Sequence, residues 1–280
     1  MPSLEKGFQG VLSDLSNDEY HASEAIGSTD IKAAVRSLAH FKAQISGQKQ
    51  YSKSTREAFD LGTAAHEMIL EKSADKFLKG PEVSSKAVKE WKAFVESNPD
   101  KIVLTPSEYN RVLSMFTVFH SHPVAQKLLN QCKVEQSYFA VDHNTGLWVK
   151  ARPDAVCEDY IVDYKTTSKA ALPREFANTC AQLSYDISAA HYMTVIGHVT
   201  QKTPKHFYWI VQEVTAPYQL MVYRASQSLL TGAQIRRDEL LSNIEKAVKA
   251  NSFPGYSTDV LDLDLPVWAI EQQVLEGVVA

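Results

Sequence analysis

The sequence predicts an α/β protein with a mixed central β-sheet, helices on both of its sides and a helical N-terminal region. Apolar residues recur at helical spacing through much of residues 1–130, whereas alternating apolar runs bounded by turn residues, typical of strands, begin at Val134. Helical spacing returns near Pro173 and over residues 226–250, with strand-like runs between. We therefore expect one domain over residues 1–280, with an insertion near 73–106 and the sheet core in 131–280.

Composition limits the class of protein. A chain of 280 residues with 44% apolar content can bury a large core. Its net charge of −4 is no signature of a nucleic-acid binder, although acids in a site lower the net charge while basic patches stay local. The three cysteines are widely spaced and are expected to be reduced thiols, not a disulfide or zinc framework. Without a long apolar run, we expect a soluble cytoplasmic protein with no membrane contact.

A first helix is expected to begin at Ser28-Thr29-Asp30, because apolar residues from Ile31 to Phe41 then share one face. Ser28 and Thr29 at its N-terminus could cradle a terminal phosphate. No residue from Ile31 to Arg56 is acidic, so this stretch is the best candidate for contacting a phosphate backbone, with a solvated basic surface as the alternative. Its cations are Lys32, Arg36, Lys42, Lys49, Lys53 and Arg56.

A second helix is expected over residues 55–72. Gly62 in its interior costs about 1 kcal/mol relative to alanine, so we expect a neighbouring element to approach closely there. His66 lies four residues later on the same face. A core histidine is the ordinary interpretation of His66, and a metal or phosphate contact is the alternative. Glu67 and Glu71 are expected to face solvent.

A hairpin is expected from Val134 to Ala151, with its turn at Asp142 to Gly146. Counting back from that turn puts Glu135 opposite Pro153, one residue short of Asp154. A bulge near the proline would bring Glu135 beside Asp154 as a further carboxylate; an ordinary edge-strand glutamate is the alternative. Lys150 and Arg152 flank this position, and either could contact phosphate.

Asp154 and Asp163 are expected to meet across a second hairpin that turns at Glu158-Asp159. A two-residue turn there pairs Val156 with Ile161 and places the two aspartates opposite each other on one face. Asp163 and Lys165 share a face because side chains alternate along a strand. Two carboxylates and an ammonium group therefore converge on one patch.

That patch suits a divalent metal ion. Two neighbouring carboxylates repel each other, and one would take up a proton unless a cation lies between them. Mg²⁺, or Mn²⁺ in its place, prefers carboxylate oxygens and completes its shell with water and substrate phosphate. Such a metal activates water and stabilises phosphoryl charge. A surface network of Asp154, Asp163 and Lys165, worth about 0–1 kcal/mol, is the alternative.

Helices and extended chain are expected to complete the fold. Residues 181–196 predict one helix on which Gln182 and Tyr185 share a face. After the helix at 226–250, the segment around Pro254 to Tyr256 and then Leu263 to Trp268 is expected to pack as extended chain.

Asp154 followed by Asp163-Tyr164-Lys165 resembles the motif of the PD-(D/E)XK nucleases. Over roughly residues 20–268, flanking stretches resemble the phage-type exodeoxyribonuclease VIII C-terminal domain. These stretches are Tyr20-His21-Ala22, Ser28-Thr29-Asp30, Ala39-His40-Phe41-Lys42, Phe59 to His66 and Gln182-Leu183-Ser184-Tyr185. The resemblance implies a restriction-endonuclease-like core.

In that family the site combines an early histidine, a glutamate, two acids with a lysine, and a Gln-x-x-Tyr helix. Carried over to this sequence, the pattern implies that His66, Glu135, Asp154 and Asp163 bind the metal. It implies that Gln182 orients water or a phosphate and that Tyr185 holds the scissile strand. We expect Lys165 to orient or deprotonate water and to stabilise the transition state.

The resemblance further implies a Mg²⁺-dependent exonuclease that runs 5′ to 3′ from the ends of double-stranded DNA and leaves a single-stranded tail. It implies a ring-shaped homo-oligomer, such as a tetramer, and a single-strand annealing protein as partner in phage or prophage recombination within a bacterial host. The alternatives are an endonuclease of the same superfamily and a non-catalytic DNA-binding protein that kept the fold.

Overall fold

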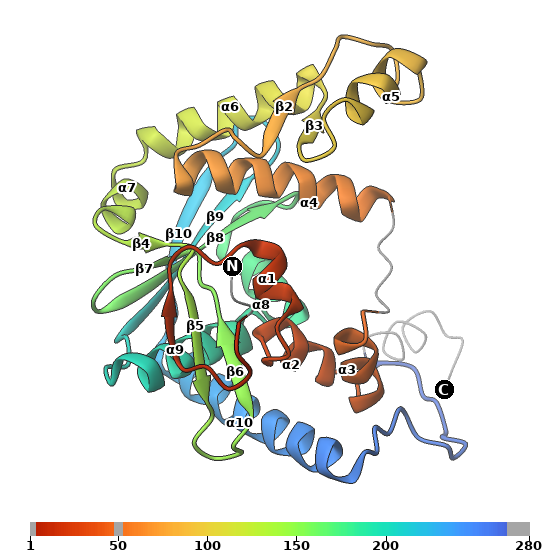
Figure 1. Ribbon diagram of the computed structural model, residues 1–280, viewed down its shortest axis with the longest axis vertical. Helices are drawn as coiled ribbons and strands as arrows, with labels where there is room; N and C mark the ends of the chain where they lie inside the picture. Colours follow the sequence, from red (N-terminus) through yellow and green to blue (C-terminus); the bar gives the residue numbers. More distant parts are fainter. Residues whose placement is uncertain (1–3, 48–52, 268–280) are drawn as a thin grey trace.

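The computed structural model describes residues 4–47 and 53–267, except for the side chains of residues 53–59. A mixed five-stranded sheet in the order β10-β9-β8-β7-β4 forms the centre, and β1, β5 and β6 form a smaller antiparallel sheet (Figure 1). The expected mixed α/β fold is confirmed. The strands of these sheets are β1 (Gly10–Leu12), β4 (Lys133–Val134), β5 (Ser137–Val141), β6 (Trp148–Ala151), β7 (Ala155–Val156), β8 (Tyr160–Thr167), β9 (His206–Glu213) and β10 (Leu220–Arg224).

Helices cover both faces of the five-stranded sheet. One face packs Val162, Tyr164 and Ile210 against α4 (Lys53–His66), the π-helix η1 (Glu67–Glu71), α6 (Pro106–Ser121) and α7 (Pro123–Leu129). The other face packs Ile161 and Phe207 against α8 (Pro173–Leu183), α9 (Tyr185–Thr200) and α10 (Gln227–Ala250). Successive side chains of β8 thus pack on opposite faces of the sheet, as expected for a strand that is buried on both faces. Within the described part of the chain, no helix is both long and apolar enough to cross a membrane.

The N-terminal region contains α1 (Asn17–Ala22), α2 (Ser28–Ala34) and α3 (Leu38–Ile45). The expectation of one helix from Ser28 to Phe41 is therefore wrong. Ser37 adopts extended backbone, and its side chain accepts a hydrogen bond from the N–H of His40 at 3.3 Å, so it caps a new helix. Serine favours such caps over helix interiors because its hydroxyl satisfies a free N–H.

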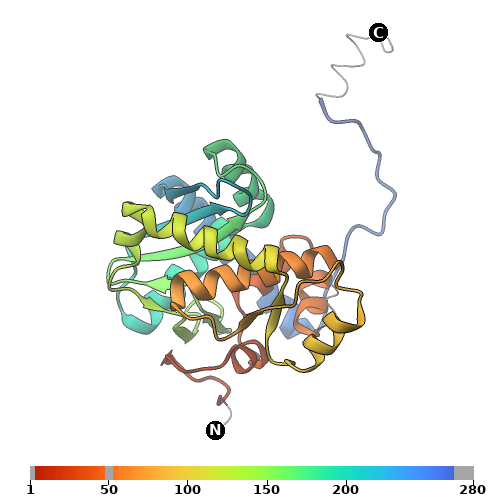
Figure 2. The same cartoon turned by 90° about the horizontal axis from the view of Figure 1, so that it is seen from above.

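The segment between η1 and α6 forms a small layer outside the central sheet. Its parallel strands β2 (Phe77–Lys79) and β3 (Ile102–Leu104) flank α5 (Lys89–Glu96). Phe77 and Leu104 pack against Leu61 of α4 and Val112 of α6. The layer therefore covers α4 and α6, which run side by side (Figures 1 and 2).

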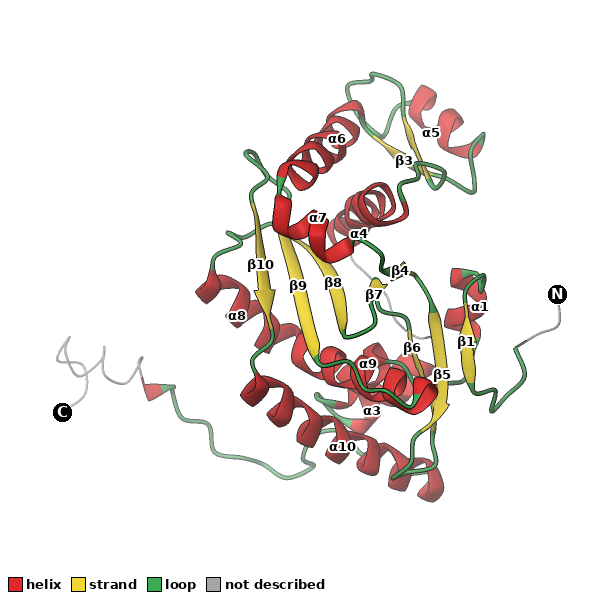
Figure 3. Cartoon of the chain, turned by 90° about the vertical axis from the view of Figure 1, so that its left-hand side faces the viewer, coloured by secondary structure: helices red, strands yellow, loops and turns green. Residues whose placement is uncertain are grey.

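Strands β4–β5 and β6–β7 form one long hairpin that passes from one sheet to the other (Figure 3). Its register is one residue away from the expected one, because Val141 pairs with Trp148 and Val134 with Ala155. Asp142 closes the tip: its N–H donates to the carbonyl of Leu147 at 2.8 Å, and its side chain accepts the N–H of Thr145 at 3.1 Å. The expected pairing of Glu135 with Pro153 and the bulge are both wrong.

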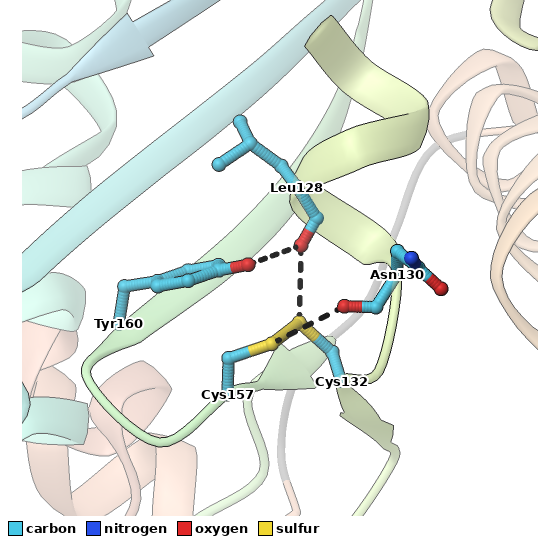
Figure 4. The surroundings of a disulfide bond; sticks show 5 residues. All are labelled: Leu128, Asn130, Cys132, Cys157 and Tyr160. Atoms are coloured by element: carbon cyan, nitrogen blue, oxygen red, sulfur yellow. Dashed lines mark hydrogen bonds between the residues drawn. A yellow bond between two sulfur atoms is a disulfide. The ribbon is translucent and has the colours of Figure 1, made fainter. Parts of the chain in front are cut away.

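Cys132 and Cys157 form a disulfide between β4 and β7, so the expectation of reduced thiols is wrong for this pair (Figure 4). The register places the two cysteines opposite each other, with Cα atoms 4.4 Å apart, at the short end of the range for disulfides. Beside the bond, Tyr160 Oη donates to the carbonyl of Leu128 at 3.0 Å. Cys180 is free and buried.

The chain after α10 first packs and then leaves the body. Phe253 stacks on Phe41, and the N–H of Ala39 donates to the carbonyl of Pro254 at 3.1 Å. Residues 257–267 then run away from the body (Figure 2). The expected packing of the last segment is wrong for Leu263 to Val267, which are exposed, and Trp268 lies outside the described residues.

Candidate active site

The candidate site lies where the long hairpin passes between the two sheets. Glu135 follows β4 with a φ of 53°, a left-handed conformation that is uncommon for a residue other than glycine. Its N–H donates to the carbonyl of Asp154 at 3.1 Å. Pro153, just before Asp154, has no N–H to offer the ladder. The irregular stretch therefore places two carboxylate-bearing residues directly opposite each other.

Asp154 immediately precedes β7, and its side chain, in place of the backbone, makes the next hydrogen bond to β8. The expected hairpin turn at Glu158-Asp159 is confirmed, because Val156 pairs with Ile161. β7 pairs with β8 only as far as Val162, and the N–H of Tyr164 donates instead to Asp154 Oδ2 at 2.6 Å. This bond fixes the Asp154 carboxylate against β8, on the register position opposite Asp163.

His66 reaches the two carboxylates from α4. The expected close approach at Gly62 is confirmed: a Cβ there would lie 3.3 Å from Thr166 Oγ1 on β8. One turn later, His66 Nε2 lies 3.1 Å from Asp154 Oδ1 and 3.5 Å from Glu135 Oε1. One donor atom from each of His66, Glu135 and Asp154 lies within 4.8 Å of the others. We call these residues the three-ligand group.

Electrostatics tie the three-ligand group together. Burial opposes charge on His66, but Asp154 and Glu135 outweigh it and raise the pKa of His66 to about 9. Burial also opposes charge on Asp154, yet His66, Lys165 and the Tyr164 N–H lower the pKa of Asp154 to about 2. Burial, reinforced by Asp154 and Glu71 and opposed by His66, raises the pKa of Glu135 to about 7. The group thus holds more negative charge than His66 alone neutralises.

Asp163 and Lys165 form an ion pair beside the three-ligand group. Their side chains share a face of β8 as expected, with Lys165 Nζ 2.5 Å from Asp163 Oδ2. Burial and Asp154 raise the pKa of Asp163 to about 6 against the opposing charge of Lys165. Burial disfavours the Lys165 ammonium, but Asp163 and Asp154 together raise its pKa. Lys165 therefore stays positively charged. The carboxylate of Asp163 pairs with Lys165 and is not part of the three-ligand group.

His66, Glu135 and Lys165 line one cleft of about 800 Å³. The cleft is bounded by α4 and η1 on one side and by the start of the chain on the other. Its charged and aromatic lining residues are Asp14, His66, Glu71, Lys76, Glu135, Arg152, Tyr164, Lys165 and Tyr185. A cleft with both carboxylates and cations can bind a metal ion together with an anionic substrate.

The π-helix η1 brings Glu71 to this cleft, a position that the sequence did not indicate. Glu71 pairs with Lys76 at 2.7 Å, and both line the cleft. Glu67 is buried and accepts the N–H of Lys76 at 2.8 Å, so the expectation that Glu67 faces solvent is wrong. At regular α-helical spacing His66 and Glu71 would face different ways, and only the wider π turn brings them together.

Gln182 and Tyr185 lie on different helices. The expected single helix over residues 181–196 is wrong, because Ser184 adopts a left-handed φ of 52° and separates α8 from α9. Tyr185 lines the cleft, with its ring centre 5.4 Å from Lys165 Nζ. Gln182 is exposed at the end of α8 and does not line the cleft.

The candidate phosphate contacts fall into different settings. Ser28 is buried, and its hydroxyl donates to Tyr192 Oη at 3.3 Å, whereas Thr29 and Arg36 are exposed. Lys32 Nζ lies 5.7 Å from the ring centre of Tyr185, next to the site. Lys42 is exposed on α3, with Nζ 5.0 Å from the ring centre of Phe253. Lys49 lies outside the described residues, as do the side chains of Lys53 and Arg56.

Lys150 and Arg152 are held by the N-terminal segment. Lys150 is buried, and its ammonium donates to the carbonyls of Tyr20 and Ser23 at 2.7 and 3.0 Å, at the end of α1. Arg152 donates to Ser137 Oγ at 2.8 Å and to the carbonyl of Leu15 at 2.9 Å while it lines the cleft. Of the two, only Arg152 lines this cleft.

Comparison with known proteins gives one family and a similar fold. Residues 27–262 match the family described as "PDDEXK-like domain of unknown function (DUF3799)". No curated protein matches the chain. A crystal structure from Eubacterium rectale, named "putative exonuclease", superposes with a TM-score of 0.63 at 13% sequence identity, covering 92% of this chain and 98% of that one. At this identity the likeness is one of fold.

Proposed function

This chain belongs to the family of PDDEXK-like domains, and we propose that it is a metal-dependent nuclease that hydrolyses DNA phosphodiesters. One observation carries the proposal: the three-ligand group adjoins the Asp163–Lys165 pair, and His66, Glu135 and Lys165 line the same cleft. The first supplies carboxylate and imidazole donors, and the second supplies a fixed cation. Metal-binding donors beside a cation are a combination that supports hydrolysis of an anionic phosphodiester.

The three-ligand group fits a divalent cation. Glu135 and Asp154 offer carboxylate oxygens, the donors that Mg²⁺ and Mn²⁺ prefer, and His66 offers an imidazole that suits Mn²⁺ as well. Burial raises the pKa of Glu135, and Asp154 and Glu71 raise it further, so a cation bound beside Glu135 would offset the repulsion among these carboxylates. We propose His66, Glu135 and Asp154 as the ligands, with Asp163 as the adjacent carboxylate that joins them once Lys165 turns to the substrate. When bound, the metal would activate water and stabilise charge on a phosphoryl oxygen.

The remaining lining residues have roles that follow from their charge. Lys165 stays protonated, so it orients water and stabilises charge that spreads over the phosphoryl oxygens in the transition state, rather than removing a proton. Tyr185, beside Lys165, is placed to hold the scissile strand, and Gln182 would have to turn inward to orient water. Arg152 and Lys32 supply positive charge on either side for the phosphate backbone.

Within the nuclease class we propose a double-strand exonuclease that works 5′ to 3′ from DNA ends, as a ring-shaped homo-oligomer. The motif resemblance and the name of the similar E. rectale structure support this choice. Its single-stranded product would pass to an annealing protein in phage-type recombination in the bacterial cytoplasm. One nuclease domain spanning the chain is consistent with the extent of the family match.

Digestion of two DNA substrates tests the proposal. A linear duplex labelled at one 5′ end and a covalently closed plasmid are each incubated with the protein and Mg²⁺ or Mn²⁺, with Asp154→Asn as the control. We expect loss of the linear duplex with the plasmid intact, and no loss with the variant. A nicked or linearised plasmid would instead indicate an endonuclease. If neither DNA changes with either metal, the remaining interpretation would be a non-catalytic DNA-binding protein.

A further inference from the structure

Residues 257–267, which we call the arm, carry five exposed large apolar side chains. Leu263 is 96% exposed, Val260 is fully exposed, and Leu261, Leu265 and Val267 are each at least half exposed. Large apolar residues gathered in this way on a soluble chain commonly mark a contact with another protein.

The arm has the sequence pattern of a strand with one apolar side. Leu261, Leu263, Leu265 and Val267 alternate with Asp262, Asp264 and Pro266. In extended chain, every second side chain points the same way, so the leucines share one side and the aspartates the other. Val260 lies on the aspartate side. Docked in an apolar groove, such a segment would bury the leucines and leave the aspartates at the rim.

The root of the arm is fixed while the arm itself is free of the body. Phe253 stacks on Phe41 of α3, and the carbonyl of Pro254 accepts the N–H of Ala39. From there the arm points away from the fold (Figures 2 and 3). An anchored root fixes where the arm starts, which lowers the entropy that its docking would cost.

A groove elsewhere on the chain matches the arm in chemistry. The α9–α10 groove has a volume of about 590 Å³ and lies between α9, the loop before β9 and the first turns of α10. Met193, Leu230 and Ile235 line it, and Ile235 is 56% exposed. Lys205, which also pairs with Asp159 at 3.3 Å, lines the groove, and no carboxylate is among its described lining residues. Apolar walls with a lysine suit a segment of leucines flanked by aspartates.

We propose that the arm of one copy docks in the α9–α10 groove of a second copy. Groove and root lie at opposite ends of α10, whose 24 residues span about 36 Å at 1.5 Å per residue. The arm leaves from the far end and heads away, so its own groove lies behind it and a neighbouring copy is the available acceptor. Such head-to-tail contacts close into a ring if the rotation between copies allows. The inference rests on the homo-oligomer proposed above, to which it gives a specific interface, and it does not depend on the nuclease activity.

Sedimentation velocity of the full chain over a range of concentrations tests the inference. We expect the wild type to self-associate, and Leu263→Ser with Leu265→Ser to weaken association at least tenfold. The matched control is Val260→Ser, which removes an equally exposed apolar residue from the aspartate side and should leave association unchanged. Ile235→Ser in the groove should weaken association like the arm variant. All four substituted side chains are exposed, so folding should be retained.

Addition of the free peptide of residues 257–267 provides a second measurement. The peptide should dissociate the wild-type assembly, and a peptide with serine at Leu263 and Leu265 should not. A monomeric wild type at every concentration would overturn the inference, and would point to an arm that folds back onto its own chain. An assembly indifferent to both the arm and the groove variants would overturn it as well. Nuclease activity enters neither measurement, so failure of one proposal is distinguishable from failure of the other.

Discussion

The backbone N–H of Glu135 donates to the carbonyl of Asp154, and this bond fixes the register of the long hairpin at the site. The same register places Cys132 opposite Cys157, three residues from each acid. One pairing thus sets both the separation of two proposed metal ligands and the position of the disulfide. A slip of one residue would turn the side chains of the strand to the other face of the sheet.

Lys165→Ala should abolish most DNA hydrolysis while it leaves DNA binding nearly intact. The fixed ammonium next to Asp163 would be lost, and removal of one such stabilising group typically lowers kcat by about 10²–10³-fold. Single-turnover digestion measures the rate, and fluorescence anisotropy with labelled duplex measures binding. Lys169→Ala, an exposed lysine just past the same strand, is the matched control and should retain the wild-type rate.

His66→Gln should weaken divalent metal binding about tenfold or more, because one of three clustered donors is lost. Titration calorimetry with Mn²⁺ measures this without any DNA substrate. His206→Gln, at an exposed position on β9, should bind Mn²⁺ like the wild type. Equal affinities for the wild type and the His66 variant would exclude His66 from the metal site.

Gly62→Ala should impair the site without destabilising the fold. Alanine favours a helix by about 0.5–1 kcal/mol over glycine, but its Cβ would lie 3.3 Å from Thr166 Oγ1 and push α4, with His66, away from β8. We expect weaker Mn²⁺ binding and little change in the free energy of unfolding. Gly232→Ala in α10, where nothing lies within 4 Å, should stabilise the fold and leave Mn²⁺ binding unchanged. Adding Thr166→Ala to Gly62→Ala should restore metal affinity, and its failure would locate the effect elsewhere.

Reduction of the Cys132–Cys157 disulfide should lower the free energy of unfolding. The bond joins residues 25 apart in sequence, and closing a loop of that size stabilises by about 3 kcal/mol in the chain-entropy estimate. Urea unfolding with and without dithiothreitol measures the loss. The double variant Cys132→Ser, Cys157→Ser should match the reduced wild type and be insensitive to dithiothreitol; a response of that variant would implicate another group.

His191 should make the fold less stable in mild acid. It is fully buried, with Nε2 donating to the carbonyl of Lys150 at 2.9 Å, and burial together with Arg237 lowers its pKa to about 3. Below the unfolded pKa of about 6.5, the unfolded chain binds a proton at His191 that the folded chain does not. The free energy of unfolding therefore decreases as the pH is lowered from about 6.5 to about 3.

Urea unfolding at pH 7.5 and pH 5.0 measures this contribution. His191 should account for about 2 kcal/mol of the wild-type loss between these pH values. His191→Gln keeps a donor for the Lys150 carbonyl, and its free energy of unfolding should decrease by about 2 kcal/mol less than that of the wild type between these pH values. His206→Gln should behave like the wild type, and identical pH dependence in all three proteins would contradict the assignment.

Much of the site could be predicted from sequence because it depends on short-range rules. The turn at Glu158-Asp159 follows from a two-residue hairpin, and the shared face of Asp163 and Lys165 follows from strand alternation. Gly62 indicated a close approach because glycine is costly inside a helix. Each of these inferences needs only neighbours in sequence.

One misplaced residue explains two of the errors. The turn was expected to include Asp142, which instead pairs with Leu147 and closes the tip. In the expected register, Glu135 lies opposite Pro153 and Cys132 opposite Val156. Neither the direct Glu135–Asp154 bond nor the disulfide could therefore be anticipated. The two cysteines were themselves a usable signal, because only the true register places them opposite each other.

The sequence by itself determined the turn at Glu158-Asp159, the shared face of Asp163 and Lys165 and the order of the acids and Lys165, since these follow from local rules. Only the tertiary structure decided how the site residues meet and which others join them. His66 meets Asp154 because α4 crosses β8, and Glu71 reaches the cleft because η1 is wound as a π-helix. Ser184 separates Gln182 from Tyr185. These arrangements arise from packing between segments far apart in the chain, where burial and long-range contacts outweigh local preference.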